Sequence, residues 1–410
     1  MSPLPIHHKP SGSDAGESLW ADVLDSVILI VDDDELHCQL IAIILRQDGF
    51  KNLHFASDGR EALQQAGDLI PDMIILDILM PNIDGLEVCR QLREMGQFKN
   101  TPIIAHTIKN SPEERAEIYD AGATDIFPKP VSEREVQNRV YMHLKYTRMV
   151  KGLTQYHRRL TRDLEEARSM QYALLPALSR LNEISESHGV EIACHSESSD
   201  ELGGDFWGID TLDEDRILIY IVDFSGHGVS AALNTFRLHS LITSYLKSEH
   251  IKNRYLTKNI ESLNRDLFGL LPVEQYATLL CGVIDVKKDS FLYVSASSTA
   301  PLILSSDTGE VTRLDPTGFP LGMIEDATYV EHAVPFKKGE LLFLYSDVLT
   351  ESLDQKGRMI GEAYFVDICQ SANAHLAEGQ NFLDRLLKSF DMLVVRPLKD
   401  DLTAATLKRL

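Results

Sequence analysis

The stretch Ser26-Val-Ile-Leu-Ile-Val-Asp-Asp-Asp34 decides the fold of the first part of the chain. Its unbroken apolar run predicts a fully buried strand, and three aspartates follow it directly. Strand-like and helix-like stretches then alternate as far as Lys129, which predicts a doubly wound, five-stranded parallel sheet of the α/β class. The other four strands are expected near residues 53–55, 73–77, 102–105 and 125–127.

Five polar residues of this segment fall at the ends of predicted strands: Asp32, Asp33, Asp77, Thr107 and Lys129. The sites of doubly wound sheets form at the carboxyl ends of the strands, so we expect these side chains to lie together. Carboxylates can hold a magnesium ion that neutralises an incoming phosphoryl group, while the lysine supplies a fixed positive charge. A lone aspartate is more often a helix cap or turn residue, but the combined set predicts a phosphoryl-binding site.

Residues 26–147 resemble the receiver domain of two-component response regulators, and the run Leu76-Asp-x-x-Met-Pro-x-x-Asp-Gly85 carries much of the resemblance. The resemblance implies that Asp77 is the phosphoacceptor. It also implies that Asp32, Asp33 and Asp77 hold Mg²⁺ and that Thr107 and Lys129 contact the phosphoryl oxygens. Two positions depart from the family pattern. Ile126 replaces the usual rotating aromatic residue, and His106 replaces the apolar residue that commonly precedes Thr107.

A long helix is predicted from about Ser132 to Leu175, because apolar residues recur at helical spacing without an internal proline. Pro176 is expected to end it. We interpret residues 148–176 as a helical linker that continues the last receiver helix and pairs with a second copy as a coiled coil. The heptads are imperfect at His157 and Asp163, and the alternative is a helix that packs on the next domain.

Four aspartates stand out in the second half because each lies in its own short motif. Asp205 lies in Gly-Gly-Asp-Phe-Trp, Asp223 in Asp-Phe-Ser-Gly-His-Gly, Asp347 in Leu-Tyr-Ser-Asp, and Asp400 in Lys-Asp-Asp-Leu-Thr. Carboxylates aimed at one place from separate segments are typical of divalent-metal sites that hydrolyse phosphate esters. Short β runs between long helices predict a layered α+β domain around them.

Residues 166–410 resemble the metal-dependent phosphatases of the protein phosphatase 2C-like (PPM) class, in the branch of the bacterial sporulation and stress phosphatases. Supporting runs are Ala167-Arg-Ser-Met-Gln171, Tyr276-Ala-Thr278 and Pro320-Leu-Gly322. The resemblance implies an α-β-β-α sandwich over residues 177–410 that binds two Mg²⁺ or Mn²⁺ ions. In the implied site, Asp223 bridges the metals and Asp205 binds one of them. Asp347 and Asp400 bind the other, the carbonyl of Phe224 completes a shell, and His227 protonates the leaving group.

Three positions depart from this second family. Val348 replaces a usual glycine, Gly208 stands where a second acid is common, and Ser297-Ser298-Thr299 replaces a Gly-His stretch. None removes a proposed ligand. Asp401 competes with Asp400 as the ligand, and adjacent acids cannot be separated by sequence.

The composition excludes several classes of function. A chain of 410 residues has room for two to three domains, and its net charge of -22 argues against a nucleic-acid-binding surface. No apolar run reaches the roughly 18 residues of a membrane span, and residues 1–25 are expected to form a flexible lead-in without a signal peptide. The cysteines lie far apart, which predicts reduced core residues in a cytoplasmic protein. They are Cys38, Cys89, Cys194, Cys281 and Cys369.

Together these features predict a response regulator whose phosphorylation at Asp77 controls a serine/threonine protein phosphatase. A histidine kinase or phosphotransfer protein is the expected phosphodonor, and the expected substrate is a phosphorylated anti-sigma-factor antagonist of a partner-switching system. We expect the anti-sigma kinase to be a separate protein, and the chain to form a homodimer without nucleic acid or membrane partners. The alternatives are a non-catalytic adaptor that binds a sigma factor or anti-sigma protein, and a receiver that drains a phosphorelay.

Overall fold

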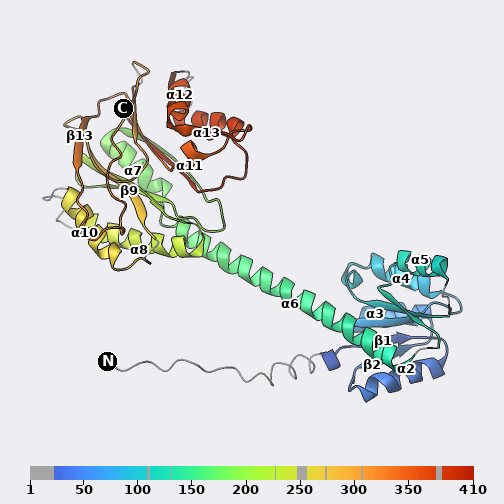
Figure 1. Cartoon of the computed structure of the whole chain (residues 1–410). Helices are drawn as coiled ribbons and strands as arrows, with labels where there is room; N and C mark the ends of the chain where they lie inside the picture. Colours follow the sequence, from blue (N-terminus) through green and yellow to red (C-terminus); the bar gives the residue numbers. More distant parts are fainter. Residues whose placement is uncertain are drawn as a thin grey trace, which may run out of the picture. The chain divides into compact units, whose positions relative to one another are not determined.

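A computed structural model of the chain describes residues 23–108, 111–130, 132–226, 228–246, 256–272, 275–305, 308–374 and 381–410. The chain divides into two compact units, residues 1–159 and 160–410, which we describe separately (Figure 1). The predicted lead-in falls mostly outside the described residues, and the predicted domain boundaries at 26, 147 and 177 remain predictions.

The first unit contains one parallel five-stranded sheet with the strand order β2-β1-β3-β4-β5. Helices α3, α4 and α5 share a hydrophobic cluster with one face of the sheet, whereas α2 and the start of α6 share a cluster with the other. This doubly wound arrangement confirms the predicted α/β fold. The elements are β1 (Ile28–Val31), α2 (Glu35–Gln47), β2 (Leu53–Ala56), α3 (Gly59–Leu69), β3 (Met73–Asp77), α4 (Gly85–Glu94), β4 (Ile103–Thr107), α5 (Pro112–Asp120), β5 (Asp125–Pro128) and α6 (Glu133–Tyr172), with a short 3₁₀ turn at Gly96–Phe98.

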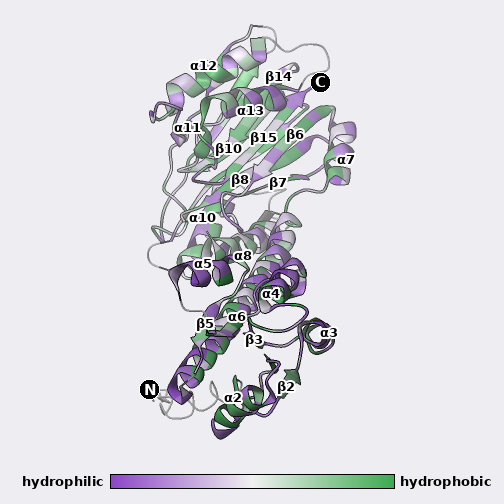
Figure 2. Cartoon of the chain, turned by 90° about the vertical axis from the view of Figure 1, so that its right-hand side faces the viewer, coloured by the Kyte–Doolittle hydropathy of each residue, from purple (hydrophilic) through white to green (hydrophobic). Residues whose placement is uncertain are grey.

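Helix α6 is a single helix of 40 residues that links the two units. Val136, Val140 and Leu144 are buried against the receiver sheet, as expected of the last helix of a doubly wound unit. Further along, hydrophobic and hydrophilic residues alternate on the helix surface (Figure 2). The helix ends at Tyr172, four residues before Pro176, so the proline does not itself set the last helical residue.

The second unit contains two antiparallel five-stranded sheets, with strand orders β13-β10-β9-β8-β7 and β12-β11-β14-β15-β6. Its strands are β6 (Val190–Glu197), β7 (Phe206–Thr211), β8 (Arg216–Phe224), β9 (Ala277–Asp285), β10 (Ser290–Ala296), β11 (Leu302–Ser305), β12 (Val311–Arg313), β13 (Glu331–Pro335), β14 (Glu340–Tyr345) and β15 (Leu402–Arg409). Its helices are α7 (Leu178–His188), α8 (Val229–Leu246), α10 (Leu256–Phe268), α11 (Val348–Glu351), α12 (Gly361–Ala374) and α13 (Phe382–Leu393).

The two sheets of this unit pack face to face around one hydrophobic cluster, which includes Trp207 and Tyr293 from the first sheet and Leu342 from the second. Helices α8 and α10 cover the outer face of the first sheet, and α12 and α13 cover the outer face of the second. The resulting α-β-β-α sandwich confirms the predicted fold. It brings the ends of strands from both sheets to one edge, where the candidate site lies.

One sequence prediction about the core was wrong. Cys194 is exposed, whereas the other four cysteines are buried. It lies on β6, an edge strand of the second sheet, opposite the buried Ala405 and on the same face as Ile192, so the position of the strand at the edge, and not the face, leaves it exposed. Among the residues that the structure describes, no helix combines the length and the apolar character that a membrane crossing requires.

Candidate functional site

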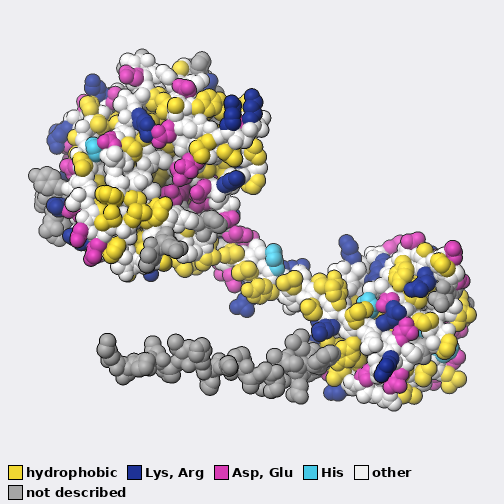
Figure 3. Space-filling view, viewed as in Figure 1, with side chains coloured by type: hydrophobic (Ala, Val, Ile, Leu, Met, Phe, Trp, Pro, Cys, Tyr) yellow, Lys and Arg dark blue, Asp and Glu magenta, His cyan; other side chains and the backbone are white. Residues whose placement is uncertain are grey.

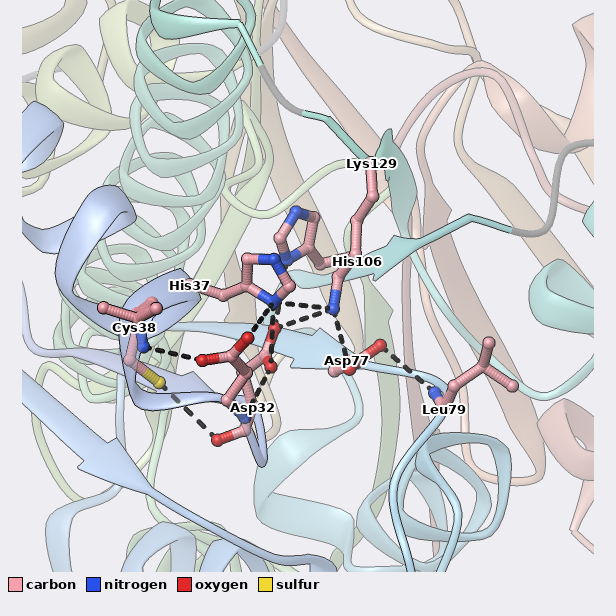
Figure 4. Close-up of polar contacts among 9 residues, drawn as sticks. Asp32, His37, Cys38, Asp77, Leu79, His106 and Lys129 are labelled. Carbon is pink, nitrogen blue, oxygen red and sulfur yellow. Dashed lines mark hydrogen bonds and ion pairs between the residues drawn. The ribbon is translucent and has the colours of Figure 1, made fainter.

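The receiver unit gathers its acidic residues at the carboxyl ends of β1 and β3. Single carboxylate oxygens of Asp32, Asp33 and Asp77 lie within 4.8 Å of one another, so they are close enough to hold one cation. The Nζ atom of Lys129 lies 2.8 Å from Asp77 Oδ2 and 2.9 Å from Asp32 Oδ2 (Figure 4). Oxygen ligands of this kind suit Mg²⁺. The structure thus brings together the acids and the lysine predicted from the strand ends.

Lys129 acts as the permanent positive charge of this site. Burial by itself raises the pKa of Asp32, but contacts with His106 and Lys129 outweigh burial and hold that pKa well below its usual range. Burial by itself lowers the pKa of Lys129, but hydrogen bonds to Asp77 and Asp32 more than compensate and raise it. Asp32 therefore stays ionised, and Lys129 stays protonated, across the physiological pH range.

The remaining receiver residues fit the predicted pattern with two local differences. Thr107 ends β4 and is buried, at the level of the acidic cluster. Ile126 is buried in β5, so its side chain is held in the core. His106 is also buried, and its Nδ1 atom lies 3.4 Å from Asp32 Oδ2. The imidazole thus contacts the acidic site directly, a role that its position in the sequence did not predict.

The four aspartates of the second unit come from the ends of four different strands. Asp205 directly precedes β7, and Asp223 lies near the end of β8, paired with Thr278 of β9. Asp347 lies two residues after β14, at the N-cap position of the short helix α11, where its side chain makes no capping hydrogen bond, and Asp400 lies just before β15. The carbonyl oxygen of Phe224 faces the same loop, since a Cβ added to Gly204 would lie 3.1 Å from it. Acidic side chains form a visible group on this unit (Figure 3).

The electrostatics of this group are those of a cation site. Burial raises the pKa of Asp205 well above its usual value, and the neighbouring carboxylates of Asp223 and Asp401 raise it further. Burial and the charge of Asp347 raise the pKa of Asp223 in the same way. Burial and Asp400 raise the pKa of Asp347 to about 6. The buried Oδ2 atom of Asp205 accepts no hydrogen bond from the described residues, so this set of donors fits divalent cations.

Asp400 and Asp401 have different surroundings, which the sequence alone could not distinguish. The buried carboxylate of Asp401 accepts hydrogen bonds from the backbone N–H of Ser199 at 2.7 Å and of Gly204 at 2.5 Å. A Cβ on Gly203 would lie 2.6 Å from Asp401 Oδ2, so this close approach requires glycine. Asp401 therefore anchors the loop that carries Asp205. Asp400 is exposed and lines a cavity together with Asp347.

Gln171, near the end of α6, holds the same loop from the other side. Its side-chain N–H donates to the carbonyl of Gly203 at 2.6 Å and to Thr235 Oγ1 at 3.2 Å, and its Oε1 accepts from the Gly203 N–H at 3.1 Å. The side chain is buried, and both its amide nitrogen and its amide oxygen form hydrogen bonds. In the sequence, Gln171 is recognisable only as part of a family motif. A glutamine so close to the Gly-Gly-Asp loop becomes recognisable as a support for Asp205 only after the chain has folded.

Two departures from the second family have local packing explanations. A Cβ on Gly208 would lie 2.2 Å from the phenol ring of Tyr220 on the neighbouring strand, so an acidic residue does not fit there. Val348 is buried at the start of α11 and belongs to the hydrophobic cluster under α12 and α13. The predicted general acid, His227, lies outside the described residues.

Comparisons with known families agree with this division of the chain. Residues 28–141 match the model of the response regulator receiver domain, and residues 213–410 match that of stage II sporulation protein E (SpoIIE). The first match contains all five predicted receiver residues. The second contains Asp223, Asp347 and Asp400, whereas Asp205 precedes it.

Individual relatives cover one part of the chain at a time. The response regulator MprA of Mycolicibacterium vanbaalenii is 42% identical over 120 residues, which are 29% of this chain and 51% of that protein. MprA of Mycobacterium ulcerans is 40% identical over 122 residues, which are 30% of this chain and 51% of that protein. The chain thus spans about half the length of these curated relatives. The SiaA-PP2C domain of Pseudomonas aeruginosa is 20% identical, with a TM-score of 0.52, over 62% of this chain and 98% of that domain, and it supports the fold of the second unit.

Proposed function

Because the chain joins a response regulator receiver domain to a SpoIIE-type phosphatase domain, we propose that phosphorylation of Asp77 controls the hydrolysis of a phosphoprotein. The phosphodonor is a histidine kinase or a phosphotransfer protein, and the substrate carries phosphoserine or phosphothreonine. By resemblance, that substrate is an anti-sigma-factor antagonist of a partner-switching system. The receiver holds Mg²⁺ through Asp32, Asp33 and Asp77. Thr107 and Lys129 contact the oxygens of the phosphoryl group on Asp77.

The metal ligands of the phosphatase domain are Asp205, Asp223, Asp347 and Asp400, with the carbonyl of Phe224. Bound Mg²⁺ or Mn²⁺ supplies the positive charge and the activated water that phosphate-ester hydrolysis requires. The raised pKa values of Asp223 and Asp347 support this assignment, because carboxylates that repel one another in a buried place are stabilised by cations. Asp400 is preferred over Asp401 because the Asp401 carboxylate is buried and accepts hydrogen bonds from the backbone of the distant Ser199 and Gly204, whereas the exposed Asp400 carboxylate accepts one from the adjacent Asp401 N–H and lines the cavity with Asp347.

The hydrogen bonds of Gln171 support the proposal that the state of the receiver affects the phosphatase site. Gln171 belongs to the helix that begins in the receiver, and it holds the backbone of Gly203, two residues from Asp205. A rotation or shift of α6 would therefore move a proposed metal ligand directly. Phosphorylation needs to change the balance between two helix positions by only a few kcal/mol to switch the site.

We also propose that the chain is a homodimer through α6. Met149, Leu153, Tyr156 and Leu160 recur at alternating spacings of four and three residues, and their side chains are between 44% and 70% exposed in the single chain. A heptad seam of this kind is covered when it packs against the same seam of a second helix. The polar Asp163 at the next seam position limits how far such a coiled coil extends.

The decisive experiment measures hydrolysis by the full chain with Mn²⁺, before and after treatment with acetyl phosphate. One substrate is p-nitrophenyl phosphate and the other is a phosphorylated antagonist protein. We expect metal-dependent hydrolysis of both, and a change in rate on phosphorylation that the Asp77→Asn variant loses.

Two outcomes would favour the alternatives. A chain without metal-dependent turnover, whose Asp223→Ala variant behaves like the wild type, would be a non-catalytic adaptor. Equal phosphatase rates with and without acetyl phosphate, despite labelling of Asp77, would favour a receiver that only drains a phosphorelay.

A further inference from the structure

A cavity of about 540 Å³ opens beside the proposed metal ligands of the phosphatase domain. Asp347 and Asp400 form part of its wall, so a phosphate bound at the metal site would have its neighbouring residues in or near this cavity. A smaller cavity, lined by Asp223 and Thr278 and also by Asp347, has a volume of about 50 Å³. Of these two cavities, the larger has room for several side chains of a protein substrate.

The wall of the large cavity combines apolar and charged side chains. Leu353 and Val395 are 39% and 58% exposed, although both are large and apolar. Glu351, at the end of α11, and Lys399, next to Asp400, also line the cavity. Neither of these two charged side chains forms an ion pair with another described residue. Exposed apolar groups between unpaired charges are typical of a surface that another molecule covers.

The cavity is formed by backbone that is already held in place. Leu353 pairs with Met359, and Asp354 pairs with Val394, in two short antiparallel bridges. The Asp354 carboxylate also accepts hydrogen bonds from the Arg358 guanidinium at 2.8 and 3.0 Å. Since Asp354 is neutralised by Arg358, and Asp347 and Asp400 belong to the metal site, Glu351 is the acidic group on this wall that remains without a partner among the described residues.

We propose that this cavity, which we call the flanking cleft (Val348, Glu351, Leu353, Val395, Leu398 and Lys399), binds the residues on either side of the phosphoserine in the substrate protein. The favoured sequence has an apolar residue next to the phosphoserine, packed against Leu353 and Val395, and a basic residue that pairs with Glu351. Lys399 complements the negative charge of the phosphate. This inference rests on the proposed phosphatase activity and names the substrate sequence which that activity prefers.

The test uses the full chain with Mn²⁺ and synthetic peptides that carry one phosphoserine. The first peptide places leucine next to the phosphoserine and arginine two residues away on both sides, and the second replaces arginine by glutamate. Assays run at moderate salt, so that the general negative field of the protein is screened. We expect kcat/KM to favour the arginine peptide by about fivefold, the effect of one partly exposed ion pair.

The Glu351→Lys variant should reverse this preference toward the glutamate peptide. Because the charge of Glu351 also raises the pKa of Asp347, the preference is measured as the ratio of kcat/KM for the two peptides, in which a change at the metal site common to both cancels. Glu186→Lys makes the same charge change on the exposed face of α7, away from the cleft, and should keep the wild-type preference. An unchanged preference in Glu351→Lys, or equal changes in both variants, would overturn the proposal.

A second pair of variants tests the apolar wall. Val395→Asp should reduce the preference for leucine over serine next to the phosphoserine, whereas Val330→Asp, at a site that is 63% exposed outside the cleft, should not. If the wild type, Val395→Asp and Val330→Asp all prefer leucine over serine to the same extent, the proposal is also overturned. If the wild type fails to hydrolyse p-nitrophenyl phosphate with Mn²⁺, the proposed function itself fails, and this result is separate from any peptide preference.

Discussion

The receiver site and the phosphatase site are both built from aspartates at the ends of strands, but their charges are balanced in different ways. In the receiver, Lys129 Nζ lies within 2.9 Å of two carboxylates, and the pKa of Asp32 is held low. In the phosphatase domain, burial and like charges raise the pKa values of Asp205, Asp223 and Asp347, and no lysine contacts them among the described residues.

This difference explains how one residue type serves two chemistries. In the proposed function, a site with its own cation is preorganised to receive a phosphoryl group on Asp77 and to release it later. A site made of carboxylates alone is electrostatically incomplete, so in the proposed function its stability and activity depend on cations from solution. The four predictions below test this contrast, from the largest expected effect to the smallest.

The largest effect is expected from Asp223→Asn, which removes the proposed bridging carboxylate. Hydrolysis of p-nitrophenyl phosphate should fall by on the order of 10³-fold at saturating Mn²⁺, because both cations lose a shared ligand. Asp367→Asn, an exposed position on α12, is the matched control and should retain wild-type rates. Similar rates in the two variants would remove Asp223 from the metal site.

Lys129→Met should leave the receiver site like the phosphatase site, with buried carboxylates and no neighbouring lysine. Loss of the lysine leaves Asp32 and Asp77 buried together without their partner, so the receiver should lose about 3 kcal/mol of unfolding free energy without divalent metal. Mg²⁺ should restore more stability to this variant than to the wild type. Hydrogen exchange of the β1 and β3 peptides in the full chain measures both effects.

Lys151→Met is the control for this change, because Lys151 pairs with Asp72 on the surface of the same unit, with its side chain 58% exposed. Removal of an exposed pair should cost less than about 1 kcal/mol. If the two lysine variants are equally destabilised, Lys129 has no special electrostatic role.

Gln171→Ala should weaken the phosphatase site without touching a proposed ligand. The loop of Asp205 loses two hydrogen bonds to Gly203, and Thr235 of α8 loses a third, so we expect the Mn²⁺ concentration for half-maximal activity to rise by about 10- to 100-fold. Gln155→Ala, at an exposed position earlier on α6, should behave like the wild type. An unchanged metal requirement in Gln171→Ala would contradict the proposed coupling through the helix.

The smallest effect is a difference in pH dependence between the two units without metal. The pKa of Asp347 is raised from its usual 3.8 to about 6, so its contribution to stability is complete below pH 3.8 and is lost as pH rises through 6. The depressed pKa of Asp32 acts in the opposite direction, since its contribution is present above pH 3.8 and is lost on acidification.

Unfolding in chelator should therefore show a phosphatase domain that becomes less stable between pH 4 and 7 and a receiver that does not. Fluorescence of Trp207 reports on the phosphatase domain when Trp20, the other tryptophan, is replaced by phenylalanine. Excess Mn²⁺ should reduce the change in stability of the phosphatase domain with pH. A parallel response of both units in chelator would contradict the comparison.

The sequence determined most of the fold and the residue types of both sites. Apolar runs that end in aspartate predicted β1 and β3, because buried strands and the carboxylates at their ends both leave local patterns. The continuous helix α6 was predicted for the same reason. The exposure of Cys194 was not predicted, because local composition does not show which strand forms the edge of a sheet.

Only the tertiary structure decided how neighbouring polar residues divide their roles. Asp400 and Asp401 are equivalent in sequence, but the fold places backbone donors from the distant Ser199 and Gly204 around Asp401, whereas Asp400 is exposed and lines a cavity with Asp347. Gln171 meets Gly203, and Lys129 meets Asp32, across separations of 32 and 97 residues. Hydrogen bonds and charge interactions act over a few ångströms in space, so their partners are known only when distant segments are packed together.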